Sequence, residues 1–261
     1  MSSISFSVTF LGTGTSSGVP MIGCDCHVCV STDVKDKRLR SSILLETPAT
    51  SIVVDTGPDF RYQMLRYHVR KLDAVLFTHP HKDHIAGLDD IRAFNYLQKR
   101  PVDVYANYLT EEALRRDYYY AFSDTKYPGI PEINLHTITE DAFSVHELNV
   151  QPILTWHMKM PVLGFRFGDF TYITDANRID DDEKQKIVGS KVLVLNALRR
   201  EPHVAHFTLA EAIALVQELK VPKAYFTHIS HQLGKHAEIE KELPPGIHLA
   251  YDGLKIHFGI H

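Results

Sequence analysis

Short apolar runs recur along the chain and alternate with polar and turn-forming residues. Their length and their content of β-branched and aromatic residues predict strands. These strands are expected at residues 5–11, 42–46, 51–55, 74–78, 103–106, 150–155, 164–167, 170–174, 192–196, 224–227 and 254–258. Apolar positions that repeat at helical spacing predict helices at residues 59–67, 85–97, 110–122, 180–188 and 208–219.

The helix predicted at residues 208–219 has the clearest signal. Leu209, Ile213 and Val216 recur at helical spacing. Thr208 stands at the N-cap position, and Glu211 follows three residues later, where it can complete a capping box. Strands interspersed with helices predict an α/β protein built of two sheets covered by helices. No Pro/Gly/Ser-rich linker divides the chain, so we expect a single domain over residues 1–261.

The apolar runs are far shorter than the roughly 20 residues that a membrane helix needs, so we expect no membrane association. The chain starts with an alternating, strand-like pattern and no basic segment precedes it. We therefore expect no signal peptide and a cytoplasmic protein.

Residues that can bind metals follow the apolar runs at several points. Four runs end at His79, His157, Asp175 and His228, and a fifth ends at Asp55. The edge of a rigid sheet is where a site that needs accurate geometry is best built. One such junction could be a turn residue, whereas this repetition indicates a functional site.

The segment His79-Pro80-His81-Lys82-Asp83-His84 is the strongest motif in the chain. Imidazole nitrogen and carboxylate oxygen are ligands for zinc and manganese ions. In an extended loop, the alternating His79 and His81 lie on one side and can chelate one ion. Asp83 and His84, at the start of the next helix, can face a second ion. The alternative is that Asp83 caps the helix and the histidines are solvated.

All three cysteines lie in one short segment, as Cys24, Cys26 and Cys29. In a cytoplasmic protein this spacing favours a metal site over disulfides. A structural tetrahedral zinc needs a fourth ligand. His27 is too close in sequence for easy tetrahedral geometry, so His231 is the better candidate. The alternative is a set of reduced or redox-active thiols.

Composition adds two constraints. The chain has 16 histidines, more than average usage would give, but most of them could be ordinary surface or packing residues. The net charge is −4, with acidic and basic residues interspersed, so there is no broad basic surface for nucleic acid. Charge therefore weakly favours a small substrate.

The HxHxDH segment, followed distally by a histidine, an aspartate and a final histidine, resembles the metallo-β-lactamase superfamily. The resemblance implies an αββα sandwich, with two mixed sheets flanked by helices and a two-metal site. It implies that Asp55 orients a histidine ligand. The implied ligands are His79, His81 and His157 for one ion, Asp83, His84 and His228 for the other, and Asp175 as the bridge.

A glycine-rich opening at residues 12–14, the cysteine segment, the sequence THISHQ at residues 227–232 and Asp252-Gly253 resemble the PhnP-type phosphodiesterases of the carbon–phosphorus lyase pathway. The resemblance implies two divalent ions, manganese or zinc and possibly iron, and one structural zinc held by the cysteines and His231. It implies catalytic roles for His206, as general acid, and for Asp83. The implied substrate is a cyclic phosphate on a phosphorylated ribose, and a homodimer is compatible with the family.

A two-metal centre generates hydroxide near neutral pH and holds both the attacking and the leaving oxygen, which suits phosphodiester hydrolysis. We therefore expect a metal-dependent phosphodiesterase with a small phosphodiester as its substrate. The rival functions are a transfer-RNA 3′-processing ribonuclease, a lactone or ester hydrolase of the same fold, and a binding protein without chemistry. The intact set of ligand-type residues argues against the last of these.

Overall fold

A computed structural model describes residues 5–125 and 127–259. Its contacts divide the chain into two compact units. The first unit comprises Met1–Leu11, Ser42–Thr139 and Lys255–His261, and the second comprises Gly12–Ser41 and Glu140–Leu254. The expectation of one domain over residues 1–261 stays a prediction.

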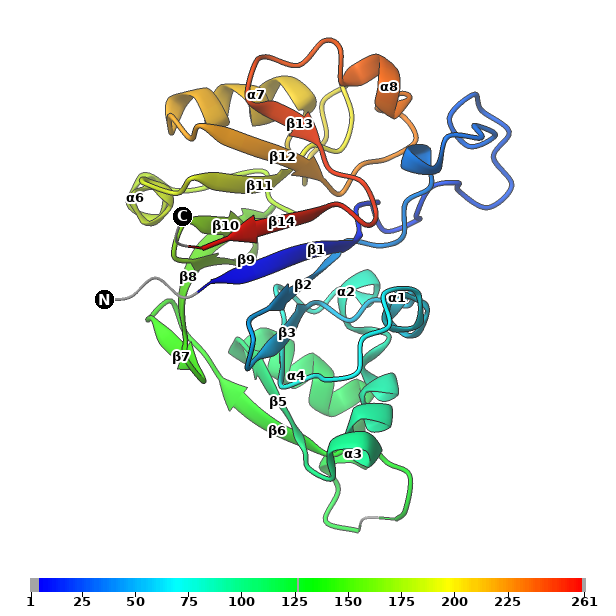
Figure 1. The fold of residues 1–261 in the computed structure, drawn as a ribbon, viewed down its shortest axis with the longest axis vertical. Coiled ribbons are helices and arrows are strands. Elements are labelled where there is room, and N and C mark those ends of the chain that lie inside the picture. The colour runs from blue at the N-terminus through cyan, green and yellow to red at the C-terminus, as the bar shows by residue number, and fades with distance from the viewer. Residues whose placement is uncertain (1–4, 126, 260–261) are drawn as a thin grey trace. The chain divides into compact units, whose positions relative to one another are not determined.

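The first unit contains a seven-stranded sheet in the order β14-β1-β2-β3-β4-β5-β6 (Figure 1). Strands β3 to β6 run parallel, while β1 pairs with β14 and β2 with β3 in antiparallel register, so the sheet is mixed. The strands are β1 (Phe6–Gly12), β2 (Ser42–Glu46), β3 (Ser51–Val54), β4 (Ala74–Leu76), β5 (Val102–Ala106), β6 (Ile133–Thr137) and β14 (Lys255–Phe258).

Short helices cover this sheet because their apolar side chains share one buried cluster with it. Phe60, Phe94 and Leu114 of the helices pack in the same cluster as Val53 and Val75 of the strands. The helical segments are α1 (Phe60–Arg66), α2 (Lys82–Ile85), η2 (Leu88–Ile91), α3 (Arg92–Gln98), α4 (Tyr108–Asp117) and α5 (Tyr119–Phe122).

The second unit contains another mixed seven-stranded sheet, in the order β13-β12-β11-β10-β9-β8-β7. Its strands are β7 (Phe143–Val145), β8 (Leu148–His157), β9 (Met160–Phe167), β10 (Phe170–Tyr172), β11 (Val192–Asn196), β12 (Lys223–Thr227) and β13 (Ile247–Leu249). Strands β7 to β10 pair antiparallel and β10 to β13 parallel. The helical segments are η1 (Val34–Asp36), α6 (Asp181–Ile187), α7 (Leu209–Glu218) and α8 (His236–Ile239).

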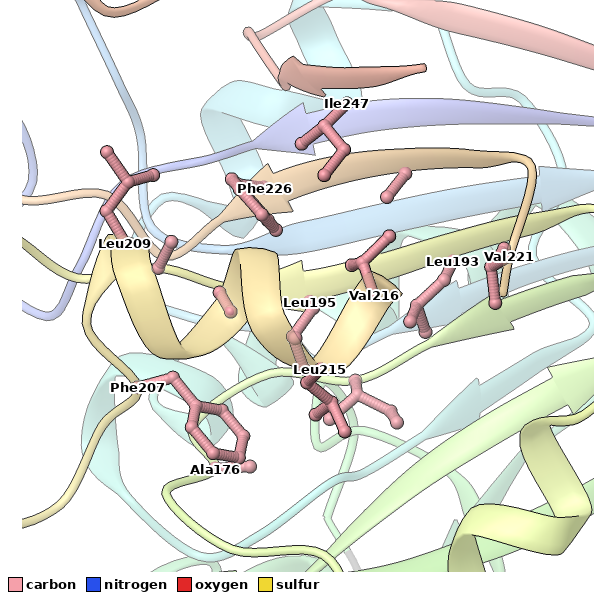
Figure 2. Close-up of a cluster of buried hydrophobic side chains, with 14 of the residues drawn as sticks. Ala176, Leu193, Leu195, Phe207, Leu209, Leu215, Val216, Val221, Phe226 and Ile247 are labelled. Atoms are coloured by element: carbon pink, nitrogen blue, oxygen red, sulfur yellow. The ribbon is translucent and has the colours of Figure 1, made fainter. Parts of the chain in front are cut away.

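Helix α7 forms where the sequence predicts it. Thr208 is the N-cap and completes a capping box with Glu211, which confirms both predictions. Such a cap stabilises a helix by about 1 kcal/mol. The apolar face of α7 packs on the sheet, where Val216 lies among buried residues that include Leu193 and Phe226 (Figure 2).

The prediction of a single helix at residues 85–97 was wrong, because the chain forms α2, η2 and α3 over this range. The interruption falls at Gly87, whose N–H donates to the Thr56 carbonyl at 2.7 Å. A Cβ at Gly87 would lie 2.2 Å from the Gly57 carbonyl oxygen. The backbone here bonds to the loop after β3, and only glycine fits so close an approach.

The predicted fold class is confirmed: two mixed sheets, each with flanking helices, make an α/β protein. The sequence pattern missed β6, β7 and β13. Within residues 5–125 and 127–259, no helix has both the length and the apolar character needed to cross a membrane.

Candidate metal centres

The histidine loop, defined as residues 79–84, follows β4 in the first unit and runs into α2. His79 and His84 are fully buried, while His81 is exposed. The centroid of the His79 ring lies 4.7 Å from that of His81 and 4.2 Å from that of His84. Three imidazole rings are thus gathered by one short loop, as the motif predicts.

Asp55 fixes the orientation of the histidine loop. Its carboxylate accepts hydrogen bonds from Thr78 N at 2.9 Å, Thr78 Oγ1 at 2.8 Å and His84 Nδ1 at 2.7 Å. Burial raises the pKa of Asp55, and its contacts with His84 and Thr78 oppose that rise. Since His84 donates from Nδ1, its Nε2 carries a lone pair, which is the form that binds a metal.

The same logic applies to His79. Thr78 Oγ1 uses its proton on Asp55, so it accepts from His79 Nδ1 at 2.9 Å, and His79 Nε2 carries the lone pair. Asp83 Oδ2 lies 3.2 Å from His84 Nε2. Two acceptor atoms at this distance are stable only with a proton or a cation beside them. This donor set fits a divalent ion of the zinc or manganese kind.

A second group, here called the strand-end cluster, belongs to the second unit. His157 is the last residue of β8, Asp175 follows β10, and His228 follows β12 directly. His206 precedes the Thr208 cap of α7. Asp175 and His228 adopt left-handed backbone conformations, with φ of 54° and 55°. These conformations are costly for residues other than glycine and concentrate at functional sites.

The side chains of the strand-end cluster converge. Donor atoms of His157, Asp175 and His206 all lie within 4.8 Å of one another. His157 Nδ1 donates to the Asp175 carbonyl at 3.1 Å, which leaves the lone pair on Nε2. His228 Nδ1 lies 3.0 Å from Asp175 Oδ1, and His228 Nε2 lies 3.1 Å from Thr15 Oγ1. This set of nitrogen and carboxylate donors also fits a divalent ion.

The His206 ring contacts two of the candidate ligands, edge-on at His157 and stacked at His228. Its ring centroid lies 4.6 Å from that of His157 and 4.9 Å from that of His228. His206 is 8% exposed, and its Nδ1 is buried without a hydrogen-bond partner among the described residues. Burial, followed by the neighbouring His228, lowers the pKa of His206 to about 3. The ring is therefore neutral near pH 7 unless an anion lies beside it.

The cysteine cluster consists of Cys24, Cys26, Cys29 and His231. One donor atom from each residue lies within 4.8 Å of the others. His231 Nδ1 is 3.4 Å from Cys24 Sγ and 3.2 Å from Cys26 Sγ. No disulfide joins the cysteines, all of which the structure describes. His27 is exposed and lies outside the cluster, as its position in the segment suggests.

The thiols of the cysteine cluster differ in acidity. The hydrogen bond with His231 lowers the pKa of Cys26 to about 6, whereas burial raises the pKa of Cys29 to about 11. Three thiolates and an imidazole gathered this closely are the donor set of a tetrahedral structural zinc. The residues present therefore fit that ion.

Sequence reasoning missed three residues that support these clusters: Thr15, Thr78 and Asn196. Thr78 orients both Asp55 and His79. Thr15 contacts His228. Asn196 ends a buried strand, and that is the same signal that points to Asp55 and His228. An asparagine attracts less notice than a histidine or aspartate because it is a poorer metal ligand.

Comparison with known proteins agrees with this architecture. A sequence profile of the Beta-lactamase superfamily domain matches residues 50–229. The chain therefore belongs to the beta-lactamase superfamily and has the metallo-β-lactamase fold. Within that superfamily it is similar to the PhnP family. The crystal structure of a diphosphatase from that family shares 39% identity and a TM-score of 0.91, covering 97% of this chain and 98% of that one.

Two curated relatives differ in length and in name. An octanoyltransferase of Porphyromonas gingivalis is 40% identical over 248 residues, which are 94% of this chain and 50% of that protein. A ribonuclease Z of Bradyrhizobium diazoefficiens is 33% identical over 85 residues, which are 32% of this chain and 23% of that protein. The chain thus spans half, or less, of the length of these relatives.

Proposed function

We propose that this hydrolase cleaves a small phosphodiester or diphosphate with two divalent ions. The ions would take ligands from both the histidine loop and the strand-end cluster. In this assignment Asp83 and His84 share one ion with His228, while His79 and His81 share the other with His157. Asp175 would contribute to both ions. The donor sets described above and the similarity to a PhnP-family diphosphatase support the assignment.

The observation that carries the proposal is His206, a buried histidine next to two candidate ligands and with an unpartnered Nδ1. Two bound divalent ions would lower the pKa of a nearby water and offset the charge of the phosphate oxygens. A phosphodiester anion beside the His206 ring favours the protonated imidazole. Substrate binding and proton uptake are then coupled, and His206 Nδ1 delivers that proton to the leaving oxygen.

We assign the cysteine cluster to a structural zinc, separate from the chemistry. The zinc would hold the segment that carries Cys24, Cys26 and Cys29 against the segment that follows β12. Hydrogen bonds already join the residues that follow β1 to the segment after β12, from Thr15 N to the Ile229 carbonyl at 3.1 Å and from Ile229 N to the Thr13 carbonyl at 2.9 Å. Metal binding and folding are coupled in such sites.

Elemental analysis of freshly purified protein, combined with a substrate panel, tests the proposal. We expect one zinc and two further divalent ions per chain. We also expect manganese-stimulated cleavage of 2′,3′-cyclic nucleotides, bis-p-nitrophenyl phosphate or a nucleoside diphosphate ester. Ions without cleavage of any phosphorus ester would refute the substrate class. Cleavage of a transfer-RNA precursor in preference to every small substrate would favour a ribonuclease instead.

The similarity to an octanoyltransferase favours a second candidate, a hydrolase of acyl esters or thioesters. That relative is about twice as long as the matched region, so its name can describe the half that this chain lacks. An octanoyl thioester and a lactone panel separate the two candidates. Thioester or lactone hydrolysis without phosphodiester cleavage would select the second one.

A further inference from the structure

Asn196 is a buried amide whose two polar atoms are both committed to one backbone residue. It is the last residue of β11 and is fully buried. Its Oδ1 accepts from Ala176 N at 2.8 Å, and its Nδ2 donates to the Ala176 carbonyl at 2.9 Å. Strands β10 and β11 pair in register only as far as Tyr172 and Val194. Beyond that point the Asn196 side chain makes with Ala176 the two hydrogen bonds that a strand backbone would otherwise make.

The backbone that Asn196 holds is adjacent to Asp175. Asp175 has a φ of 54°, a conformation that a residue other than glycine keeps only when its surroundings enforce it. Its carbonyl accepts from His157 Nδ1 at 3.1 Å. The N–H of the same peptide unit, which belongs to Ala176, donates to Asn196 Oδ1. The peptide unit that follows Asp175 is therefore fixed at both its oxygen and its nitrogen, which restricts the backbone from which the Asp175 carboxylate projects.

The Ala176 carbonyl also bonds the residue that follows His206. The Ala176 oxygen also accepts from Phe207 N at 2.9 Å, and Phe207 directly follows His206. Figure 2 shows the Phe207 ring beside Ala176, under the start of α7. Asn196 also lies opposite Thr227 in the register of β11 and β12, one residue before His228. The Asn196 side chain thus bonds Ala176, which follows Asp175, and Ala176 in turn bonds Phe207, which follows His206. The Asn196 backbone pairs with the strand that ends just before His228.

We propose that Asn196 is a positioning residue that sets Asp175 and His206 relative to each other. This inference rests on the proposed function, in which Asp175 binds the ions and His206 moves the proton. Asn196 itself touches neither ion nor substrate. It acts through Ala176, in the way that groups behind metal ligands fix ligand orientation.

The chain contains a matched control. Asn95 in α3 makes the same pair of bonds with another backbone residue: its Oδ1 accepts from Glu132 N at 2.9 Å, and its Nδ2 donates to the Glu132 carbonyl at 3.0 Å. Asn95 is 7% exposed, so the loss of its amide also leaves buried backbone groups unpaired. No candidate ligand adjoins it in sequence.

The experiment compares N196A, N196D and N95A. Each variant is stripped of its active-site ions and titrated with Mn²⁺ against a chelator, with zinc in the cysteine cluster counted as an internal standard. We expect Mn²⁺ affinity to fall by about 10-fold or more in N196A and to stay near wild type in N95A. In N196D the volume is kept, but a carboxylate oxygen faces the Ala176 carbonyl, so a similar loss is expected. The visible absorption of the Co²⁺-loaded protein should shift only in the Asn196 variants.

The outcomes separate two failures. Wild-type Mn²⁺ affinity and an unchanged Co²⁺ spectrum in N196A, with only a lower Tm as in N95A, would overturn the role of Asn196 alone. A wild-type protein that binds no ion beyond one zinc would overturn the proposed function. If N196A does not fold, N196D carries the same comparison.

Discussion

The two units hold their candidate ligands by different means. In the first unit a buried carboxylate, Asp55, accepts hydrogen bonds from Thr78 and from the ring of His84. In the second unit the corresponding contacts of His157 and Asp175 are neutral, since His157 donates to a backbone carbonyl and Asn196 fixes Ala176. A carboxylate behind an imidazole makes it a more basic ligand, whereas a neutral contact sets direction alone.

In both units, candidate-site residues other than glycine adopt a left-handed backbone conformation. Asp55 has a φ of 64°, close to the values at Asp175 and His228. Such conformations cost roughly 1–2 kcal/mol each. Each follows a strand, where the neighbouring sheet hydrogen bonds can enforce it. The difference between the units therefore lies in how the side chains are held, and substitutions can measure it.

The largest expected effect concerns the proton donor in the second unit. His206→Ala should lower kcat by about 10²–10⁴-fold, because general acid catalysis is lost. The ions should remain, and elemental analysis checks this. His203→Ala is the control, since His203 packs 5.0 Å from the His206 ring but outside the ligand set. Loss of one ion in His206→Ala would instead make His206 a ligand.

The next largest effect is expected from the Asp55 carboxylate, which accepts a hydrogen bond from His84 in the first unit. Asp55→Asn keeps the shape but removes the charge behind His84, so metal affinity should fall by about 10–100-fold. Chelator competition measures it. Asp73→Asn is the matched control: Asp73 is also a buried carboxylate of this unit, and it accepts from Ser51 N at 2.8 Å. Equal affinity losses in both variants would show general destabilisation rather than a role for the charge.

The cysteine cluster predicts that the second unit depends on zinc for stability. Cys24→Ser should remove one zinc per chain and lower Tm by roughly 10 °C or more, before chemistry is affected. Elemental analysis and calorimetry check this. His27→Ala changes an exposed histidine of the same segment and should keep the zinc. Full zinc content and an unchanged Tm in Cys24→Ser would end the structural-zinc assignment.

The smallest effect is a pH dependence in the second unit. His236 is buried, and its Nδ1 accepts from Arg38 Nη2 at 3.2 Å. Burial, followed by the charge of Arg38, lowers the pKa of His236 to about 4. The unfolded chain takes up this proton below about pH 6.5, and the folded chain does so only near its lowered pKa. The stability from neutral His236 is therefore present above that range and is lost as pH falls.

His236→Gln removes this titration. Its Tm should fall less steeply than that of wild type between pH 6.5 and 4, by roughly 2–4 °C over the range. Parallel curves for the two proteins would show that another group accounts for the acid sensitivity.

Elements that a local sequence pattern specifies were predicted correctly, whereas features that depend on contacts between distant residues were missed. The strand at Val192–Asn196 was predicted with its observed bounds, because every residue of it is apolar except the last. Strand β6 was missed because its side chains are mostly half-buried or exposed, as suits a polar strand at the edge of the sheet. The break at Gly87 depends on a contact with residues 56 and 57, which no local pattern can show.

The residues of the candidate centres also differ in how easily the sequence reveals them. The histidine loop and the cysteine segment are compact in sequence, so spacing and chemistry suffice to find them. Asn196 and Thr15 matter through partners far along the chain, and neither carries a charge that would draw notice. The fourth member of the cysteine cluster, His231, was found because it follows His228 so closely in sequence.

The short spacing between His228 and His231 restricts insertions and deletions in this segment. His228 ends the strand-end cluster and His231 completes the cysteine cluster, with only Ile229 and Ser230 between them. Inserting or deleting one residue here would displace a ligand of both clusters at once. The turn at residues 47–50, which joins β2 to β3, by contrast carries no candidate ligand. In descendants of this gene, residues 228–231 should change by substitution long before they change in length.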